Sequence, residues 1–326
     1  MSAPLDSDPF VYTAHAHSKV NIHLGVEEPR EDGFHELASV FQSLELHDTV
    51  TLTDLGNPEV DKPRIQGLKV TGPHAQGVPE DYTNLAWTAV NRIMQYLYTT
   101  HGPKALPEVA LEIHKAIPTA GGMAGGSADA AAALRLAERC YGGYYNIDSV
   151  GEPILDALGA ALGSDVPFTL LGGTALGTGR GEQLTPMMAR GTYHWALIAS
   201  DRGLSTPQVF HKLDEMREKG RGGAPHMDTA AVSQALISGD PHRVAQHLHN
   251  DLQPAALSLR PDLRKTLEAG VAAGALAGIV SGSGPTCAFL CAGAEEAQEV
   301  VSQVTVEILG TKGVATHGPA SGAVVL

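Results

Sequence analysis

The sequence predicts an α+β fold in two domains. Alternating apolar and polar runs, typical of strands, are mixed with apolar residues at helical spacing, and the two kinds do not alternate strictly. A length of 326 residues is enough for two domains that each bury a core. The pattern changes around residues 178–190, so we expect one domain over residues 1–180 and a second over residues 181–326. The last strand, residues 323–326, belongs to the second domain or returns to pair with the first.

Strands come first in the N-terminal half, and one amphipathic helix follows them. Leu85, Ala89, Ile93 and Leu97 recur every four residues, which predicts a helix that begins at Asn84. Residues 25–33 are charged and rich in turn formers, so we expect a turn there. Strands are expected at residues 11–14, 19–24, 40–46, 50–52 and 109–113.

Helices dominate the rest of the chain. Short apolar runs at residues 168–171 and 174–176 precede the domain boundary. Helices are expected at residues 127–140, 153–162, 206–219, 228–238, 241–249, 261–273 and 295–309. Strands are expected at residues 195–199, 278–281, 286–291 and 314–316.

Composition and charge narrow the class of protein. With 43% hydrophobic and 18% charged residues, the chain has the composition of an ordinary globular protein. A net charge of −14, without clustered Lys and Arg, argues against a nucleic-acid partner or an anionic membrane surface. Three cysteines, no apparent signal peptide and no membrane-length apolar run predict a cytoplasmic protein. The sequence leaves open whether it is a monomer or a homodimer.

The fifteen histidines do not predict a transition-metal site from their spacing. His15 and His17 are two residues apart, as are His247 and His249, and the sequence contains no His-Glu-x-x-His motif. We therefore expect surface histidines rather than metal ligands.

The most informative segment is residues 118–129, in which four glycines fall within six positions ahead of an alanine-rich run. A loop with few side chains lets its backbone approach a ligand closely. The helix expected from Ser127 leaves its first N–H groups and its positive dipole end facing the loop, which favours a phosphate. The candidate phosphate-binding residues are Pro118, Thr119, Ala120, Gly121, Gly122, Met123, Ala124, Gly125, Gly126, Ser127 and Ala128.

Several better-known nucleotide motifs do not fit this loop. A Walker A loop needs Lys-Ser or Lys-Thr after its second glycine, and the spacing of a dinucleotide fingerprint is also missing. His-Arg-Asp and Asp-Phe-Gly of protein kinases do not occur. The alternative for the loop alone is a glycine-rich turn that only allows close helix packing. Alanine at a positive φ is costly, so we expect the loop to avoid such angles at Ala120 and Ala124.

Three further segments complete a pattern. Lys19 and Asn21 lie on an early strand, Asp165 lies between a glycine turn and a proline, and Gly282, Ser283 and Gly284 form a second glycine-rich turn. Together with residues 118–129 they resemble, in order and over nearly the whole chain, the three motifs of the GHMP kinases, the galactokinase, homoserine, mevalonate and phosphomevalonate kinase superfamily. Residues 30–37 (Arg-Glu-Asp-Gly-Phe-His-Glu-Leu) and 205–210 resemble the branch of that superfamily that phosphorylates the 2-hydroxyl of a CDP-linked methylerythritol in the non-mevalonate isoprenoid pathway.

The resemblance implies a ribosomal-protein-S5-domain-2-like ATP domain followed by a ferredoxin-like α+β domain, with ATP and Mg²⁺ as cofactors. It implies that residues 118–128 wrap the ATP phosphates, with Ser127 near a phosphate or Mg²⁺. Asp165 would orient the acceptor hydroxyl or accept its proton, and Lys19 would neutralise charge at the transferring phosphoryl group. The implied substrate-binding residues are Asn21, Phe34, His35, Phe210, Gly282, Ser283 and Gly284.

Other interpretations stay open from the sequence. A homoserine or mevalonate kinase of the same superfamily fits the ATP motifs equally well but leaves His35 without a role. A non-catalytic nucleotide sensor or an interaction scaffold is a third possibility. Taken singly, Lys19 could be a solvated lysine, Asp165 a helix cap, and Phe34 and Phe210 core aromatics.

Overall fold

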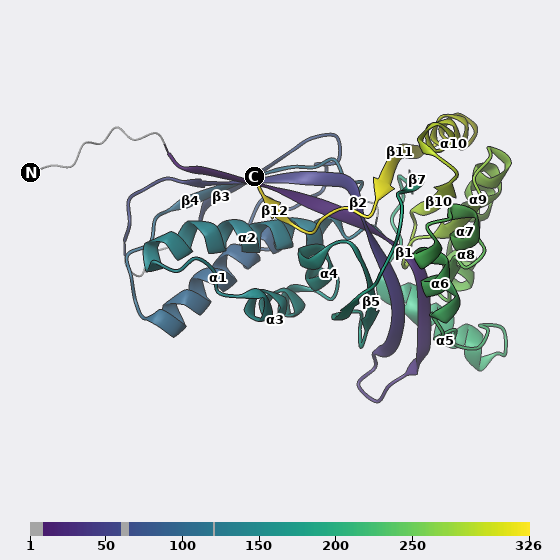
Figure 1. The fold of residues 1–326 in the computed structure, drawn as a ribbon, viewed down its shortest axis with the longest axis horizontal. Helices are drawn as coiled ribbons and strands as arrows, with labels where there is room; N and C mark the ends of the chain where they lie inside the picture. The colour runs from purple at the N-terminus through teal and green to yellow at the C-terminus, as the bar shows by residue number, and fades with distance from the viewer. Residues whose placement is uncertain (1–8, 60–64, 120) are drawn as a thin grey trace, which may run out of the picture.

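A computed structural model describes residues 9–59, 65–119 and 121–326. Two β-sheets with helices packed on them confirm the predicted α+β class (Figure 1). Helix α2 lies on the large sheet with α1 and α3 packed against it, and the helices α6 to α10 gather around the small sheet on the other side of the molecule (Figure 1). The strands are β1 (Val11–Pro29), β2 (His35–Asp54), β3 (Ile65–Thr71), β4 (Val109–His114), β5 (Thr174–Thr178), β6 (Gln183–Pro186), β7 (Tyr193–Ser200), β8 (His249–Asn250), β9 (Ala277–Val280), β10 (Cys287–Cys291), β11 (Thr311–Gly318) and β12 (Val324–Val325).

The helices are interspersed among the strands, often two or three in succession. They are α1 (Leu85–His101), α2 (Gly125–Tyr145), α3 (Glu152–Leu162), α4 (Val166–Leu171), α5 (Thr206–Glu218), α6 (Ala230–Ser238), α7 (Pro241–Ala245), α8 (Gln253–Leu259), α9 (Asp262–Ala272) and α10 (Ala294–Glu307). Within the described residues, no helix is both long and apolar enough to cross a membrane.

Both sheets draw strands from distant parts of the chain. The large sheet has the order β12-β1-β2-β4-β3, with β5 on β2, β6 on β5 and β8 on β1. The small sheet has the order β11-β7-β10-β9. The terminal strand β12 pairs antiparallel with β1, so the end of the chain lies in the large sheet. The division into domains at residue 180 stays a prediction.

The long antiparallel pair β1–β2 is the main departure from the expected elements. Residues 25–33 were expected to form a turn, but β1 continues to Pro29 and pairs with β2 to that point. The physical reason is burial, because Leu24 and Val26 pack in the core of the second half of the molecule. Only the short connection closed by the Gly33 N–H, which donates to Arg30 O, turns the chain.

Several helix boundaries also differ from the prediction. Helix α2 was expected to end at Cys140 but reaches Tyr145, where Asn146 adopts a left-handed conformation. Helix α6 begins at Ala230 rather than Asp228, whose carboxylate accepts the Ala230 N–H. The helix expected over residues 241–249 ends at Ala245 because His249 and Asn250 pair with β1. Strands β3, β6 and β8 and helix α8 were not predicted, and the apolar run at residues 168–171 belongs to helix α4.

The alanine-rich sequence of α2 is explained by its central position. Its residues Ala130 to Ala133 are fully buried, and the helix packs on β1, β2 and α1. Small side chains let the helix axis approach the sheet closely and fill the interface without voids. The start of α2 is thereby fixed relative to β1, which carries Lys19.

Candidate active site

A cleft of about 1210 Å³ brings together the predicted motifs. It is larger than the 300–1,000 Å³ typical of a site for one small ligand, so it has room for two. Its walls come from β1, the loop before α2, the connection between α3 and α4, helix α5 and the turn after β9. The predicted residues that line it are Lys19, Asn21, Phe34, His35, Pro118, Thr119, Gly121, Gly122, Met123, Ala124, Gly125, Gly126, Ser127, Asp165, Phe210, Gly282 and Ser283.

Three predicted residues are not brought to this cleft or lie outside the described residues. Ala128 is fully buried and its N–H donates to Ala124 O inside helix α2, so it is not available to a phosphate. Gly284 lies next to the lining residue Ser283 but is not part of the wall. Ala120 lies outside the residues that the structure describes.

The loop before α2 has an unusual backbone. Gly121 and Gly122 have φ angles of 104° and 87°, which only glycine adopts readily. Ala124 has a φ of 58°, so the expectation that this alanine avoids a positive φ is wrong. It occupies the N-cap position of α2, where the chain must turn into the helix.

The start of α2 is a suitable anion site. No side chain among the described residues caps the helix, since the N-cap residue Ala124 has no polar group. The N–H groups of Gly125, Gly126 and Ser127 precede the first helical bond, in which the Ala128 N–H donates to Ala124 O. These N–H groups and the helix dipole favour negative charge in the adjacent cleft.

The turn between β9 and β10 holds the glycine loop in place. The Ser281 hydroxyl donates to Gly122 O at 2.8 Å, and the Thr286 hydroxyl donates to Gly121 O at 2.8 Å. A side chain on Gly122 would lie 2.4 Å from Ser281 O, so the approach requires glycine. The second glycine motif therefore supports the first, a contact between residues about 160 positions apart that the sequence did not predict.

Lys19 and Asp165 face each other in the cleft. Strand alternation places Lys19 and Asn21 on one face of β1, while Val20 and Ile22 enter the core on the other. Lys19 Nζ lies 3.6 Å from Asp165 Oδ2 and donates to Asn21 Oδ1 at 2.7 Å. Lys19 is only 4% exposed, so it is not a solvated surface lysine.

The surroundings of this pair leave the Asp165 carboxylate accessible. Asp165 occupies the N-cap position of α4, but its side chain makes no capping hydrogen bond within the described chain. Its side chain is 32% exposed. Asn21 is oriented by Ser39, to which its Nδ2 donates at 2.8 Å. One carboxylate thus faces the cleft beside a buried ammonium group.

His35 and two phenylalanines line another part of the cleft. His35 Nε2 donates to Asp214 Oδ1 at 2.9 Å, because a carboxylate offers only acceptors. The ring centroid of Phe210 lies 5.1 Å from that of His35. Phe34 is 49% exposed and carries the Arg180 guanidinium over its ring at 4.9 Å, so it is not a core residue.

Asp214 and Arg180 were not predicted. Asp214 is separated from His35 by 179 residues and has no local motif of its own. Its position on α5, one helical turn after Phe210, is a signal that could have been used once Phe210 was proposed as a ligand contact.

A buried charged cluster of Lys115, Asp48 and Asp129 lies below the glycine loop and was also missed. Lys115 Nζ donates to a carboxylate oxygen of Asp48 and, at 2.6 Å, to Asp129 Oδ2. Burial lowers the pKa of Lys115, but the two carboxylates outweigh it and the pKa is raised. Burial raises the pKa of Asp129, and the neighbouring Lys115 ammonium opposes that rise. The other oxygen of Asp48 accepts the N–H groups of Ala116 and Ile117, just before the loop.

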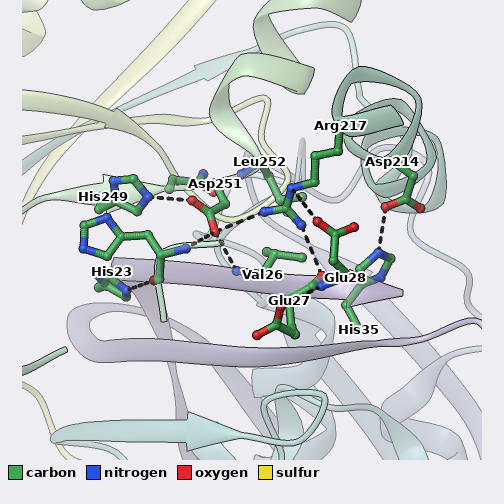
Figure 2. Close-up of polar contacts among 12 residues, drawn as sticks. His23, Val26, Glu27, Glu28, His35, Asp214, Arg217, His249, Asp251 and Leu252 are labelled. Carbon is green, nitrogen blue, oxygen red and sulfur yellow. Dashed lines mark hydrogen bonds and ion pairs between the residues drawn. The ribbon is translucent and has the colours of Figure 1, made fainter. Parts of the chain in front are cut away.

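A second polar cluster attaches α5 to β1 (Figure 2). Asp251 Oδ2 accepts the Val26 N–H at 2.8 Å and lies 3.5 Å from Arg217 Nη2, while its Oδ1 accepts from His249 Nε2 at 2.7 Å. Burial opposes ionisation of Asp251, but these donors lower its pKa. The cluster ties the end of α5 to β1, which positions the face of α5 that lines the cleft.

His23 is a buried histidine beside this cluster (Figure 2). Its Nε2 lies 2.9 Å from His226 O and its ring is 5.4 Å from that of His249. Burial is the main cause that lowers its pKa to about 4, and the two neighbouring histidines add to it despite the carbonyl contact. His23 is therefore neutral at physiological pH.

Family models and relatives agree with this geometry. A model of the GHMP kinases N terminal domain matches residues 84–173, and a model of the GHMP kinases C terminal matches residues 232–307. A protein of Corynebacterium diphtheriae named 4-diphosphocytidyl-2-C-methyl-D-erythritol kinase is 56% identical over 318 residues, which cover 96% of this chain and 97% of that protein. This chain belongs to the 4-diphosphocytidyl-2-C-methyl-D-erythritol kinase family of GHMP kinases. It is an ATP-dependent small-molecule kinase.

Other relatives and solved structures match the chain at lower identity. A relative of the same name from Mycolicibacterium smegmatis is 48% identical over 96% of this chain and 92% of that protein. A crystal structure of 4-(cytidine 5'-diphospho)-2C-methyl-D-erythritol kinase matches with a TM-score of 0.72 and 28% identity, over 94% of this chain and 100% of that one. A homoserine kinase from Cytophaga hutchinsonii matches with a TM-score of 0.70 over the full length of both chains, but at 16% identity, which shows the fold alone.

Proposed function

We propose that this protein transfers the γ-phosphoryl group of ATP to the 2-hydroxyl of 4-diphosphocytidyl-2-C-methyl-D-erythritol, a step of the non-mevalonate isoprenoid pathway. The observation that carries the proposal is that one cleft joins the Lys19–Asp165 pair to the glycine loop and to the His35–Asp214 pair. A glycine loop, an ion pair or a paired histidine also occurs singly in proteins that transfer no phosphate. A cleft with room for two ligands that contains all three fits a kinase with a nucleotide-linked acceptor.

The glycine loop is assigned to the phosphates of ATP. The N–H groups at the start of α2 supply donors and positive potential without a mobile side chain. Ser127, at the third position of α2, adds a hydroxyl on the same wall. A fixed backbone cradle stabilises the developing charge without reorganising during the reaction.

Asp165 and Lys19 are assigned to the transfer itself. The substrate hydroxyl oxygen attacks the γ-phosphorus, the bond to the β-γ bridging oxygen breaks, and ADP leaves. The hydroxyl proton passes to Asp165, whose accessible carboxylate also orients the hydroxyl. Lys19, held by Asn21, neutralises charge on the transferred phosphoryl group.

A magnesium ion fits the donors of this cleft. Mg²⁺ prefers oxygen ligands, and the Ser127 hydroxyl and the Asp165 carboxylate are oxygen donors on the cleft walls. When bound with ATP, the ion would neutralise charge on the phosphates. We assign Ser127 as a candidate ligand.

His35 is assigned to the cytosine ring. Because its Nε2–H is engaged by Asp214, its Nδ1 keeps a lone pair and can accept a hydrogen bond from the cytosine amino group. Phe34 and Phe210 offer ring faces for stacking beside it. Asn21, Gly282 and Ser283 are assigned to the diphosphate or polyol, since they line the wall next to Lys19. We place the reaction in the cytoplasm because the three cysteines are free and buried.

A coupled assay of ADP release with three acceptors tests the proposal. We expect turnover with 4-diphosphocytidyl-2-C-methyl-D-erythritol and none above background with homoserine or mevalonate. Turnover of only the latter two would reject the substrate assignment. Binding of ATP with no turnover of any acceptor would favour a nucleotide sensor instead.

A further inference from the structure

Three histidines that spacing alone did not connect lie together on the paired strands β1 and β2. His15 and His17 of β1 and His47 of β2 form a three-histidine cluster in which the potential ligand atoms all lie within 4.8 Å of one another. The ring centroids of His15 and His47 are 3.9 Å apart, and those of His17 and His47 are 5.1 Å apart. None of the three is among the residues that line the cleft.

Strand register explains the cluster. Residues two apart on a strand share a face, so His15 and His17 point the same way from β1. His47 is the direct partner of His17 in the β1–β2 ladder. Immediately afterwards the register shifts, with Ser18 opposite Leu44, so two residues of β2 are looped out beside the cluster. The third histidine is therefore supplied by a cross-strand pairing.

The hydrogen bonds of two rings favour metal ligation. His17 Nδ1 lies 3.0 Å from Leu44 O, and His47 Nδ1 lies 2.7 Å from Glu45 O. A carbonyl only accepts, so each Nδ1 carries the proton and each Nε2 keeps its lone pair. A ring N–H donated to a carbonyl is the arrangement that commonly orients a metal-bound histidine.

Charge and access are also compatible with a cation. Burial, with His47 next, lowers the pKa of His15 although Glu45 opposes it, and burial likewise lowers the pKa of His17. A lowered pKa favours the neutral ring, which is the form that binds a metal ion. His15 and His47 are half-buried, so solvent reaches part of each residue.

We propose that the three-histidine cluster binds a divalent transition-metal ion, Zn²⁺ by preference. The bound ion links β1 to β2 next to Lys19. Three imidazoles and one water complete the tetrahedral coordination that Zn²⁺ prefers, whereas Mg²⁺ prefers oxygen ligands. Tetrahedral nitrogens lie about 3.3 Å apart, so the rings must close by up to about 1.5 Å on binding. This site is separate from the Mg²⁺ of the kinase reaction and does not rest on the proposed substrate.

Metal titration of untagged, chelator-treated protein tests the proposal. Zn²⁺ is added against a competing chromophoric chelator, and Co²⁺ is used as a probe whose visible absorption reports tetrahedral coordination. We expect one Zn²⁺ per chain, not displaced by excess Mg²⁺, and a rise in Tm on binding. Absence of stoichiometric binding at micromolar free Zn²⁺ would overturn the proposal.

Matched variants locate the site. His15→Gln and His47→Gln should each weaken Zn²⁺ binding by about 100-fold or more, since each removes a ligand. The control His317→Gln alters a histidine pair across β7 and β11 whose rings are 5.9 Å apart and should bind Zn²⁺ as the wild type does. The control His226→Gln alters the histidines near Asp251 and should likewise leave Zn²⁺ binding unchanged. Loss of binding in a control but not in His47→Gln would reject the assignment.

A measurement on the wild type guards against variants that fail to fold. Long-range ¹H–¹⁵N spectra of the histidine rings should show Zn²⁺-dependent shifts at Nε2 of His17 and His47 and at one ring nitrogen of His15. Shifts confined to other histidines would contradict the proposal.

Discussion

Two lysine–aspartate groups in this protein, a pair and a group of three, differ in ways that separate function from stability. In the cleft, Lys19 and Asp165 are 3.6 Å apart and the Asp165 side chain is 32% exposed. Below the glycine loop, Lys115 contacts Asp48 and Asp129 directly, and each of these side chains is no more than 3% exposed. The open pair can exchange its partner for a substrate. The sealed group borders the cleft at Lys115 and Asp129, but its side chains are almost fully covered and engaged with one another, so its main role is to hold its neighbours in place.

The sealed group also serves the open one. Asp48 binds the backbone N–H groups of Ala116 and Ile117 at 2.6 Å and 2.8 Å, and Asp129 lies on α2 just after the loop. The group of Lys115, Asp48 and Asp129 therefore holds both ends of the segment that forms the candidate anion site. From this contrast we expect charges accessible from the cleft to control turnover and sealed charges to control folding.

The largest expected effect is on turnover through the open pair. Asp165→Ala should lower kcat by about 1,000-fold, because positioning of the hydroxyl and proton transfer are both lost. ATP affinity and Tm should change little. Steady-state kinetics and ATP titration measure this, with the exposed Asp148→Ala as control. A variant with wild-type kcat would remove Asp165 from the mechanism.

Substitutions in the sealed group should lower the free energy of unfolding rather than turnover. Lys115→Met leaves two buried carboxylates without a cation and should lower the free energy of unfolding by about 3–5 kcal/mol. Denaturant unfolding measures the loss. The control Lys69→Met breaks the exposed pair with Glu112, in which the lysine side chain is 69% exposed, and should cost less than about 1 kcal/mol. Equal losses in the two variants would invalidate the distinction.

A sealed histidine extends the comparison to pH. The folded pKa of His23, about 4, lies below the usual 6.5, so the unfolded chain binds more protons between these values. Stability contributed by neutral His23 is present above pH 6.5 and is lost as pH falls toward 4, by about 3 kcal/mol at most. Unfolding measured from pH 7 to pH 4 should show a shallower fall for His23→Gln than for wild type. The exposed His211→Gln should retain the wild-type slope.

The smallest expected effect concerns a charge at the edge of the cleft. Asp214→Asn should raise KM for the cytidyl substrate by about tenfold, since the amide no longer fixes the His35 tautomer, and should leave KM for ATP unchanged. His35→Ala should have a larger effect on the same constant. Steady-state kinetics with each substrate varied in turn give the two KM values separately. Glu215→Gln on the same helix is the control. A selective rise in KM for ATP would reverse the assignment of this end of the cleft.

Local chemistry accounts for what the sequence could predict. The glycine-rich loop, the helix after it and the strand that carries Lys19 depend on residues within about ten positions of one another, and each lies in the cleft as expected. The lengths of β1 and β2 could not be predicted in the same way. Strand β1 continues past Gly25, still paired with β2, because Leu24 and Val26 are buried against the second half of the molecule; the turn-forming residues themselves do not predict this.

By itself, the sequence determined which side chains stand at Lys19, Asp165 and His35 and where the glycine-rich loop lies. The prediction of a phosphate site depends only on these residue types and their short spacing. The tertiary structure alone decided which distant residues complete each group. Lys115 meets Asp48 across 67 positions, and His47 meets His17 through strand register. Such pairs depend on how the chain folds into the sheet. The periodicity of apolar residues along the sequence carries no information about these long-range contacts.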